Sequence, residues 1–356
     1  MINKDNLNWV KNLRVLATIS VIVLHVSSGI LYQYGTILNS VWWVGNIYDS
    51  VVRFCIPIFL MISGTLLLNK EYELYDFLKN RFSRIILPFL FWSFIYAFFA
   101  LRVKFLENPE LSFYEICRLA FFLFKNGTSF HLWYVYMIIG IYLFVPILNK
   151  WIRNATEKEI LYFISIWILT IFFSQPIIQR AKINIDAIYF SGYIGYLVLG
   201  HYLSFKFFTD HVKKIRFIST ALFIAGTAIA IFGTYFLTKR ANHFVDYFYG
   251  NFTLNIIISS VGVFLLIKNV KILNPFLTRI IDFINKYSYG IYLVHILVLQ
   301  FIEFLGISYD FINPVIAIPI ITIMCLSISL FIVFAINKLP YGRYISGQFL
   351  HCFHYN

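Results

Sequence analysis

Long apolar stretches, separated by short polar and basic segments, run along almost the whole of this chain. About 20 apolar residues are enough for an α-helix to cross the ~30 Å hydrocarbon core of a bilayer. The pattern predicts ten membrane-spanning helices, over Leu13–Tyr32, Tyr48–Leu68, Ile85–Leu101, Leu132–Leu148, Ile160–Ile178, Ile188–Phe208, Phe217–Leu237, Thr253–Ile267, Tyr287–Leu305 and Pro314–Asn337. We therefore expect an all-α polytopic membrane protein.

Composition supports this class. Of the 356 residues, 60% are hydrophobic and only 13% are charged, whereas a soluble domain has about a quarter charged. The net charge of +13 does not indicate a nucleic-acid partner, because the basic residues are spread between the apolar spans instead of forming one patch. The four cysteines have no CxxC spacing and indicate neither a disulfide framework nor a metal site.

The distribution of lysine and arginine predicts the orientation. Cytoplasmic loops of membrane proteins carry an excess of these residues. With the N-terminus in the cytoplasm, the inner segments hold 20 of them and the outer segments eight. We therefore expect both termini on the cytoplasmic side, a single integral membrane domain over residues 1–356, and a short cytoplasmic tail over about 338–356.

Three further expectations concern local structure. Pro88 should break the third span near its start, because an internal proline removes a helical hydrogen bond. Tyr72–Ser83 and Ser112–Lys125 mix aromatic or aliphatic residues with charges, as helices that lie on the membrane surface do. We expect these two segments to rest on the membrane without crossing it.

The first span carries two ionisable residues, Arg14 and His25. Their separation of eleven residues is about three helical turns, which places them within ~20° of one face and ~16 Å apart along the axis. Ionisable groups within a membrane helix are costly and usually functional. Arg14 could instead be an interfacial anchor, and His25 a hydrogen-bonded packing residue.

Two other charged pairs are candidates. Asp49 and Arg53 are one helical turn apart near the outer end of the second span, so they can form an ion pair, either for function or for structure alone. Arg81 and Arg84 lie at the inner end of the third span, where two guanidinium groups could bind phosphate. The alternative is an ordinary basic flank.

Polar residues also mark two later spans. Ser288, Tyr292 and His295 line one face of the ninth span, where they could support a site or hold helices together. His131 and Trp133 lie at the outer end of the fourth span, which is also where an interfacial aromatic belt is expected.

These features together predict a site for acyl transfer. The ~16 Å from the arginines at the inner surface to a mid-membrane histidine is roughly the reach of a pantetheine arm from phosphate to thioester. A hydroxyl acceptor could approach from the outer side, near Asp49, Arg53 and His131. Histidine could act there as a general base or as a transient acyl carrier.

The sequence resembles the acyltransferase 3 family of membrane-bound acyltransferases over nearly its whole length. Five motifs in order carry this resemblance: Arg14-x10-His25, Asp49-x3-Arg53 followed by Pro57-Ile-Phe-Leu-Met-Ile-Ser-Gly64, Arg81-x2-Arg84 before Pro88, Phe130-His131-Leu-Trp133-Tyr134, and Ser288-Tyr-Gly-Ile-Tyr292-Leu-Val-His295. The fourth motif is similar to the compact branch that acetylates bacterial surface glycans.

The resemblance implies ten helices in the bacterial cytoplasmic membrane, a cytoplasmic acyl-CoA donor, usually acetyl-CoA, and a glycan or lipid-linked saccharide acceptor. It implies His25 as the catalytic residue, and Arg14, Arg81 and Arg84 as ligands of the donor. We add Asp49 as a second catalytic residue. The supporting or acceptor-side residues are Arg53, His131, Trp133, Ser288, Tyr292 and His295.

The predicted function is thus membrane-bound O-acetyl transfer to a surface glycan, with acyl-CoA as a substrate and no permanently bound cofactor or metal. Succinyl or longer acyl groups remain open, as does the choice between acyl-histidine and general-base chemistry. The alternative is a polysaccharide exporter or flippase without acyl transfer, although the inverted repeats common in transporters are not evident.

Overall fold

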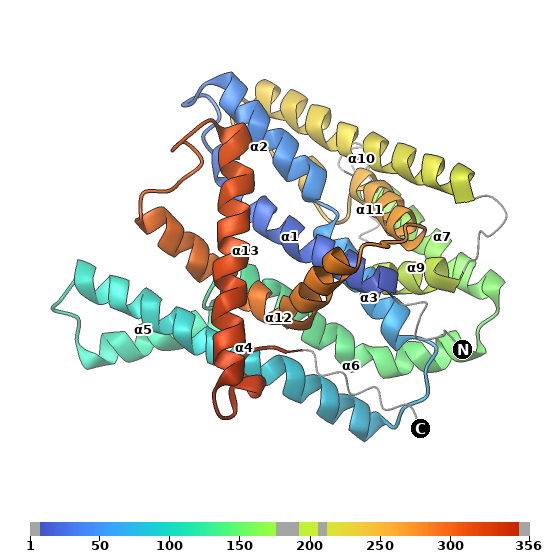
Figure 1. The fold of residues 1–356 in the computed structure, drawn as a ribbon, viewed down its shortest axis with the longest axis horizontal. Coiled ribbons are helices and arrows are strands. Elements are labelled where there is room, and N and C mark those ends of the chain that lie inside the picture. Colours follow the sequence, from blue (N-terminus) through green and yellow to red (C-terminus); the bar gives the residue numbers. More distant parts are fainter. Residues whose placement is uncertain (1–7, 176–191, 206–211, 349–356) are drawn as a thin grey trace. The chain divides into compact units, whose positions relative to one another are not determined.

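The computed structural model describes residues 8–175, 192–205 and 212–348, and within these ranges every regular element is a helix. Figure 1 shows them in chain order, from α1 in blue to α13 in red. In these ranges, eight helices are long and apolar enough to cross a membrane. One of them is interrupted, and two others begin with a 3-10 turn. Their bounds are Asn8–Leu31 (α1), Asn39–Leu67 (α2 and α3), Leu74–Glu107 (α4), Phe130–Asn154 (η2 and α6), Val212–Ala241 (α10), Tyr247–Lys268 (η5 and α11), Pro275–Phe304 (α12) and Pro314–Lys338 (α13).

The predicted fifth and sixth spans correspond to shorter helices. Helix α7, Glu157–Phe173, has 17 residues, and α9, Ile194–Phe205, has 12. The end of the predicted fifth span and both ends of the sixth fall in 176–191 and 206–211, outside the described residues. The all-helical membrane fold is confirmed, while the count of ten spans and the sides of the two termini stay predictions.

The second span differs from its prediction. It begins at Asn39, nine residues earlier than expected, and is divided into α2, Asn39–Val52, and α3, Cys55–Leu67. Polar residues lower the mean hydropathy of the part before Tyr48, so the apolar pattern did not predict a membrane span there. The break follows from Pro57, which has no N–H to donate to the carbonyl of Arg53 four residues earlier.

Two predictions about the third span are wrong. Helix α4 runs without a break from Leu74 to Glu107, through Pro88 (Figure 1), so most of Tyr72–Ser83 is its first part and not a separate surface helix. Pro88 removes the helical N–H bond to the carbonyl of Arg84, four residues earlier. One residue on, the Tyr289 hydroxyl donates to the carbonyl of Ile85 at 2.9 Å. Membrane helices tolerate internal prolines where neighbouring groups can reach the backbone.

Helix α5, Phe113–Asn126, is a separate helix, as predicted for Ser112–Lys125. A capping box starts it: Ser112 accepts from the N–H of Glu115, and the Glu115 carboxylate accepts from the N–H of Ser112. None of its side chains is buried within the protein. Its position on the membrane surface stays a prediction.

The chain divides into two compact units, each built from several chain segments. Unit 1 comprises Met1–Lys70, Ile147–Asn285 and Gly306–Met324, and unit 2 comprises Glu71–Pro146, Lys286–Leu305 and Cys325–Asn356. In unit 1, α3 and α9 pack backbone to backbone through two glycines. A Cβ on Gly64 would lie 1.9 Å from the carbonyl oxygen of Leu197, and one on Gly200 would lie 2.3 Å from that of Met61.

In unit 2, the segment after α13 folds back onto the helices. It contains the 3-10 turn η6, Gly342–Tyr344. The indole of Trp92 on α4 donates to the carbonyl of Ile345 at 3.1 Å, and the amide of Asn337 on α13 donates to the hydroxyl of Ser346 at 3.0 Å. The part of the predicted tail up to residue 348 is therefore packed, and residues 349–356 lie outside the described chain.

Candidate functional site

Arg14 and His25 lie on the single unbroken helix α1, eleven residues apart as the sequence predicts. Both side chains are half-buried. The Arg14 guanidinium donates from Nη1 to the Oδ1 atom of Asn285 on α12 at 3.0 Å. One turn earlier on both helices, Lys11 forms an ion pair with Asp282 at 2.8 Å. These contacts fix the direction of the Arg14 side chain, and sequence reasoning had found neither Asn285 nor Asp282.

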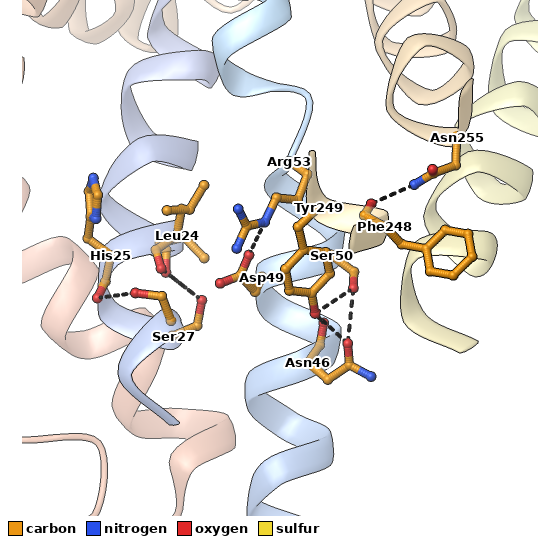
Figure 2. A network of polar contacts seen from close by, with 12 residues as sticks. Leu24, His25, Ser27, Asn46, Asp49, Ser50, Arg53, Phe248, Tyr249 and Asn255 are labelled. Carbon is orange, nitrogen blue, oxygen red and sulfur yellow. Dashed lines mark hydrogen bonds and ion pairs between the residues drawn. The ribbon is translucent and has the colours of Figure 1, made fainter. Parts of the chain in front are cut away.

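Asp49 and Arg53 form the predicted ion pair, through Oδ1 and Nε. The Asp49 side chain is completely buried, with 0% exposed, whereas 19% of the Arg53 side chain remains exposed. In Figure 2 the imidazole of His25 points away from the Asp49 carboxylate. A joint catalytic role for Asp49 and His25 stays a prediction.

A polar network surrounds this ion pair in unit 1. The ring of Tyr249 in η5, Tyr247–Tyr249, lies 4.0 Å from the guanidinium carbon of Arg53. The Tyr249 hydroxyl donates to Oδ1 of Asn46 at 2.5 Å, and the Ser50 hydroxyl donates to the Tyr249 hydroxyl at 3.2 Å. The Asn46 amide in turn donates to the carbonyl of Ile231 on α10 at 3.0 Å. Figure 2 shows Asp49, Arg53 and their polar neighbours.

Sequence reasoning missed three members of this network. Asn46 and Ser50 share the i, i+4, i+7 face that ends at Arg53, so the spacing of polar residues could have revealed them. Tyr249 gave no signal, because 196 residues separate it from Arg53 in the chain and tyrosine is abundant throughout.

In unit 2 the structure brings together residues from two predicted motifs. His131, in the 3-10 turn η2 (Phe130–Leu132), and His295 on α12 are both buried, and their ring centroids are 5.1 Å apart. The Tyr292 hydroxyl donates to the carbonyl of His131. The Nδ1 atom of His295 lies 2.6 Å from the carbonyl oxygen of Tyr292. Because a carbonyl can only accept, Nδ1 of His295 carries a proton.

Tyr96 on α4 joins this cluster and was missed by the sequence analysis. Its ring lies 5.2 Å from that of His131, and its hydroxyl donates to the carbonyl of Leu293 at 2.9 Å. Ser288 is buried on the same helix as Tyr292 and His295, whereas Trp133 is 43% exposed.

The remaining candidates, Arg81 and Arg84, are half-buried on α4 in unit 2. The Arg81 guanidinium lies 5.8 Å from the ring centroid of Phe77. Since Arg14 and His25 belong to unit 1, a common site of the three arginines with His25 stays a prediction. No group of three or more His, Cys, Asp or Glu side chains that could hold a metal ion occurs in the ranges that the structure describes.

Comparison with known proteins adds three findings. The model of the acyltransferase 3 family, described as "Acyltransferase domain", matches residues 7–334. A protein of Bacillus subtilis (strain 168), named "Putative membrane-bound acyltransferase YfiQ", is 23% identical over an alignment that covers 94% of this chain and 93% of that protein. No solved structure gives a significant match.

Proposed function

We propose that this chain, which belongs to the acyltransferase 3 family, is an O-acetyltransferase of the bacterial cytoplasmic membrane. In this proposal it moves an acetyl group from cytoplasmic acetyl-CoA to a hydroxyl group of a cell-surface or lipid-linked glycan. The main support is helix α1, which is unbroken from Asn8 to Leu31 and carries Arg14 and His25 eleven residues apart. That spacing matches the length of a pantetheine arm, at ~16 Å along the axis.

The arginines would hold the donor. Guanidinium groups bind phosphate bidentately, so Arg14, Arg81 and Arg84 are suited to the phosphates of coenzyme A. The hydrogen bond from Arg14 to Asn285 supports this role, because it orients the guanidinium before the donor arrives. A pre-oriented group loses less conformational entropy when a ligand binds.

His25 would carry the chemistry. As a general base it takes the proton of the acceptor hydroxyl, whose oxygen then attacks the thioester carbonyl carbon. The new C–O bond forms, the C–S bond breaks, and the thiolate of coenzyme A takes up the proton from the imidazole. If His25 instead acts as a nucleophile, its nitrogen attacks the thioester carbonyl carbon, so that a C–N bond forms, the C–S bond breaks and coenzyme A leaves as the thiolate. The acceptor oxygen then attacks the acetyl carbon, the C–N bond breaks, and the thiolate takes up the hydroxyl proton. Both routes give free coenzyme A and an acetyl ester.

The other candidates would form the acceptor half of the site. The Asp49–Arg53 pair would shape it. Tyr292 and His295, which contact each other and His131, would provide a rigid polar wall, with Ser288 and Trp133 beside them in the sequence. A bound sugar has many hydroxyl groups, and such side chains can donate to or accept from them.

The test uses the purified full chain in detergent, with acetyl-CoA and measurement of both coenzyme A release and acetyl transfer. His25→Ala should lower turnover by about 100-fold or more, the range for loss of a general acid–base group. His243→Ala is the matched control, because His243 is exposed and its Nδ1 atom lies 3.0 Å from the backbone carbonyl oxygen of Ala241, two residues away. Unchanged turnover in His25→Ala would reject the assignment, and a wild-type protein that consumes no acyl-CoA would favour the exporter.

A second arm tests the donor residues. Arg14→Ala and Arg84→Ala should each raise the apparent KM for acetyl-CoA, by about tenfold if one charge-assisted phosphate contact is lost. Arg118→Ala, an exposed arginine on α5, is the control. An effect on acceptor use alone would contradict the donor role. Mass spectrometry of surface glycans from a deletion strain would identify the acyl group.

A further inference from the structure

A tyrosine remote in sequence from every predicted motif holds the guanidinium of Arg53. Tyr249 lies in η5, between α10 and α11, and only 4% of it is exposed. Its ring centroid is 4.0 Å from the guanidinium carbon of Arg53, a distance at which a cation is attracted to the face of an aromatic ring. The guanidinium of Arg53 therefore has two contacts, one with this ring and one with the carboxylate of Asp49 (Figure 2).

Tyr249 is itself fixed. Its hydroxyl donates to the side-chain oxygen of Asn46 at 2.5 Å and accepts from Ser50 at 3.2 Å. Asn46 is tied to α10 by its bond to the carbonyl of Ile231. The ring is thus oriented by hydrogen bonds that join α2, η5 and α10. An aromatic ring that only filled space would not need these two polar contacts at its hydroxyl.

The burial of the ion pair separates the roles of its two partners. Asp49 is completely enclosed and cannot reach a ligand without rearrangement, whereas Arg53 keeps 19% of its side chain exposed. A guanidinium has five N–H donors in a planar fork. Its ion pair with Asp49 is formed through Nε, so the N–H donors of the two terminal nitrogens are on atoms outside that contact.

We propose that Arg53 contacts an oxygen of the acceptor, and that Asp49 and Tyr249 are positioning residues that hold its guanidinium. This proposal rests on the proposed function. It assigns the contact with the acceptor to Arg53 and not to Asp49. Asp49 supplies the compensating charge, and Tyr249 sets the plane of the fork. The donors of Arg53 would bind a hydroxyl or ring oxygen of the sugar, so that the reacting hydroxyl is presented in a fixed orientation.

The experiment measures separate KM values for donor and acceptor on the purified full chain. Acetyl-CoA is the donor, and a panel of methyl pyranosides serves as the acceptor probe. Tyr249→Leu removes the ring face and should raise the acceptor KM by about tenfold, with the KM for acetyl-CoA unchanged. Tyr249→Phe keeps the ring and should lie within about threefold of the wild type, as for loss of a single hydrogen bond. Tyr235→Leu is the control, because the ring of Tyr235 packs on that of Trp43, with centroids 4.6 Å apart, and the cation near it is Lys239, at 5.8 Å.

A double-mutant cycle shows whether Tyr249 acts through Arg53. Arg53→Lys keeps the charge and loses the planar fork. If Tyr249 works by orienting that fork, Tyr249→Leu should add little to the acceptor KM once Arg53 is lysine. A purely structural tyrosine would instead lower the yield and the turnover of both backgrounds by the same factor, with no selective change in acceptor KM.

The outcomes distinguish this proposal from the one on which it depends. A wild-type protein that turns over no acetyl-CoA overturns the proposed O-acetyltransferase function together with this proposal. If the wild type is active, and Tyr249→Leu has the wild-type acceptor KM, only the positioning role is rejected. If Tyr249→Leu does not accumulate, Tyr249→Phe and Arg53→Lys still test the positioning role. A large rise in the acceptor KM of Tyr249→Phe would contradict the idea that the ring face orients Arg53.

Discussion

The two units bury polar side chains in different ways. In unit 1, Asp49 and Arg53 bring two opposite charges together within one helical turn, and the aspartate is fully enclosed. In unit 2, His131, Tyr292 and His295 form a cluster whose hydrogen bonds end mainly on backbone carbonyls, and the contacting residues are about 160 positions apart in the chain.

This difference has an energetic consequence. A buried charge that loses its partner is left without compensation, which costs far more than the loss of one neutral hydrogen bond. A cluster that uses backbone carbonyls has acceptors that no side-chain substitution removes. Unit 1 should therefore be sensitive to changes of charge, and unit 2 to changes of packing.

The largest expected effect is for Asp49→Ala, which leaves Arg53 without its carboxylate. We expect a loss of about 3 kcal/mol in the free energy of unfolding, the lower end for breaking a buried pair, because Arg53 is partly exposed and water screens its charge. Chemical denaturation of the purified protein in detergent, followed by tryptophan fluorescence, measures this change.

Glu107→Ala is the matched control for that prediction. Lys104 and Glu107 also form an ion pair on a helix, at 2.8 Å, but both side chains are more than half exposed. Removal of an exposed pair should cost no more than about 1 kcal/mol. Equal losses in the two variants would mean that the burial of Asp49 does not determine the strength of its pair.

The unit 1 pair also shows what the sequence could predict. Asp49 and Arg53 are one turn apart, so helical geometry alone was enough to predict their contact. The same rule predicted that Arg14 and His25 share one helix, and that Tyr292 and His295 share a face. The pattern of apolar residues located all eight long helices of the described ranges, five of them to within six residues at both ends. The helices that begin at Asn39, Leu74 and Pro275 start nine, eleven and twelve residues before their predicted starts.

Long-range packing explains what the sequence could not predict. The partners of Arg14 and Arg53 are Asn285 and Tyr249, and a local pattern cannot tell which distant residue will meet a given side chain. The break expected at Pro88 was wrong, because α4 continues through the proline, which membrane helices can accommodate when their neighbours are in place.

The second prediction tests the sensitivity of unit 2 to packing. Gly290 lies within the Ser288–His295 motif, and a Cβ there would be 2.1 Å from the carbonyl oxygen of Ser346 and 2.6 Å from Val333. Gly290→Ala must therefore push the segment after α13 away from α12, at a cost of about 1–3 kcal/mol in the free energy of unfolding. The same denaturation experiment measures the loss.

Gly140→Ala serves as the control, since Gly140 also lies in a helix of unit 2 but a Cβ there would meet no atom within 4 Å. Alanine favours a helix over glycine, so this variant should be unchanged or more stable by about 0.5–1 kcal/mol. If Gly290→Ala behaved like Gly140→Ala, the packing of the segment after α13 would not constrain the motif.

The smallest effect concerns a feature that the units share. Capping boxes start α5 in unit 2 and α7 in unit 1. Hydrogen bonds from the Ser112 hydroxyl and N–H lower the pKa of Glu115 below its usual 4.5, and those from the N–H and hydroxyl of Thr156 lower the pKa of Glu159. Because the folded-state pKa values are lowered, the caps contribute fully above about pH 4.5, and their contribution is lost as the pH falls through the lowered values.

Hydrogen exchange of the first-turn amides of α5 and α7, corrected for intrinsic rates, should therefore accelerate as the pH falls below about 4.5. The first turn of α4 is the internal reference, because its N-cap residue, Glu73, forms no side-chain cap. Both caps are exposed and use the same hydrogen bonds between a hydroxyl, a carboxylate and backbone N–H groups. The exchange rates of the two helices should therefore rise alike, although their units differ in their buried polar groups. A response in α5 but not in α7 would show that the surroundings of each unit, and not the cap itself, control the ends of these helices.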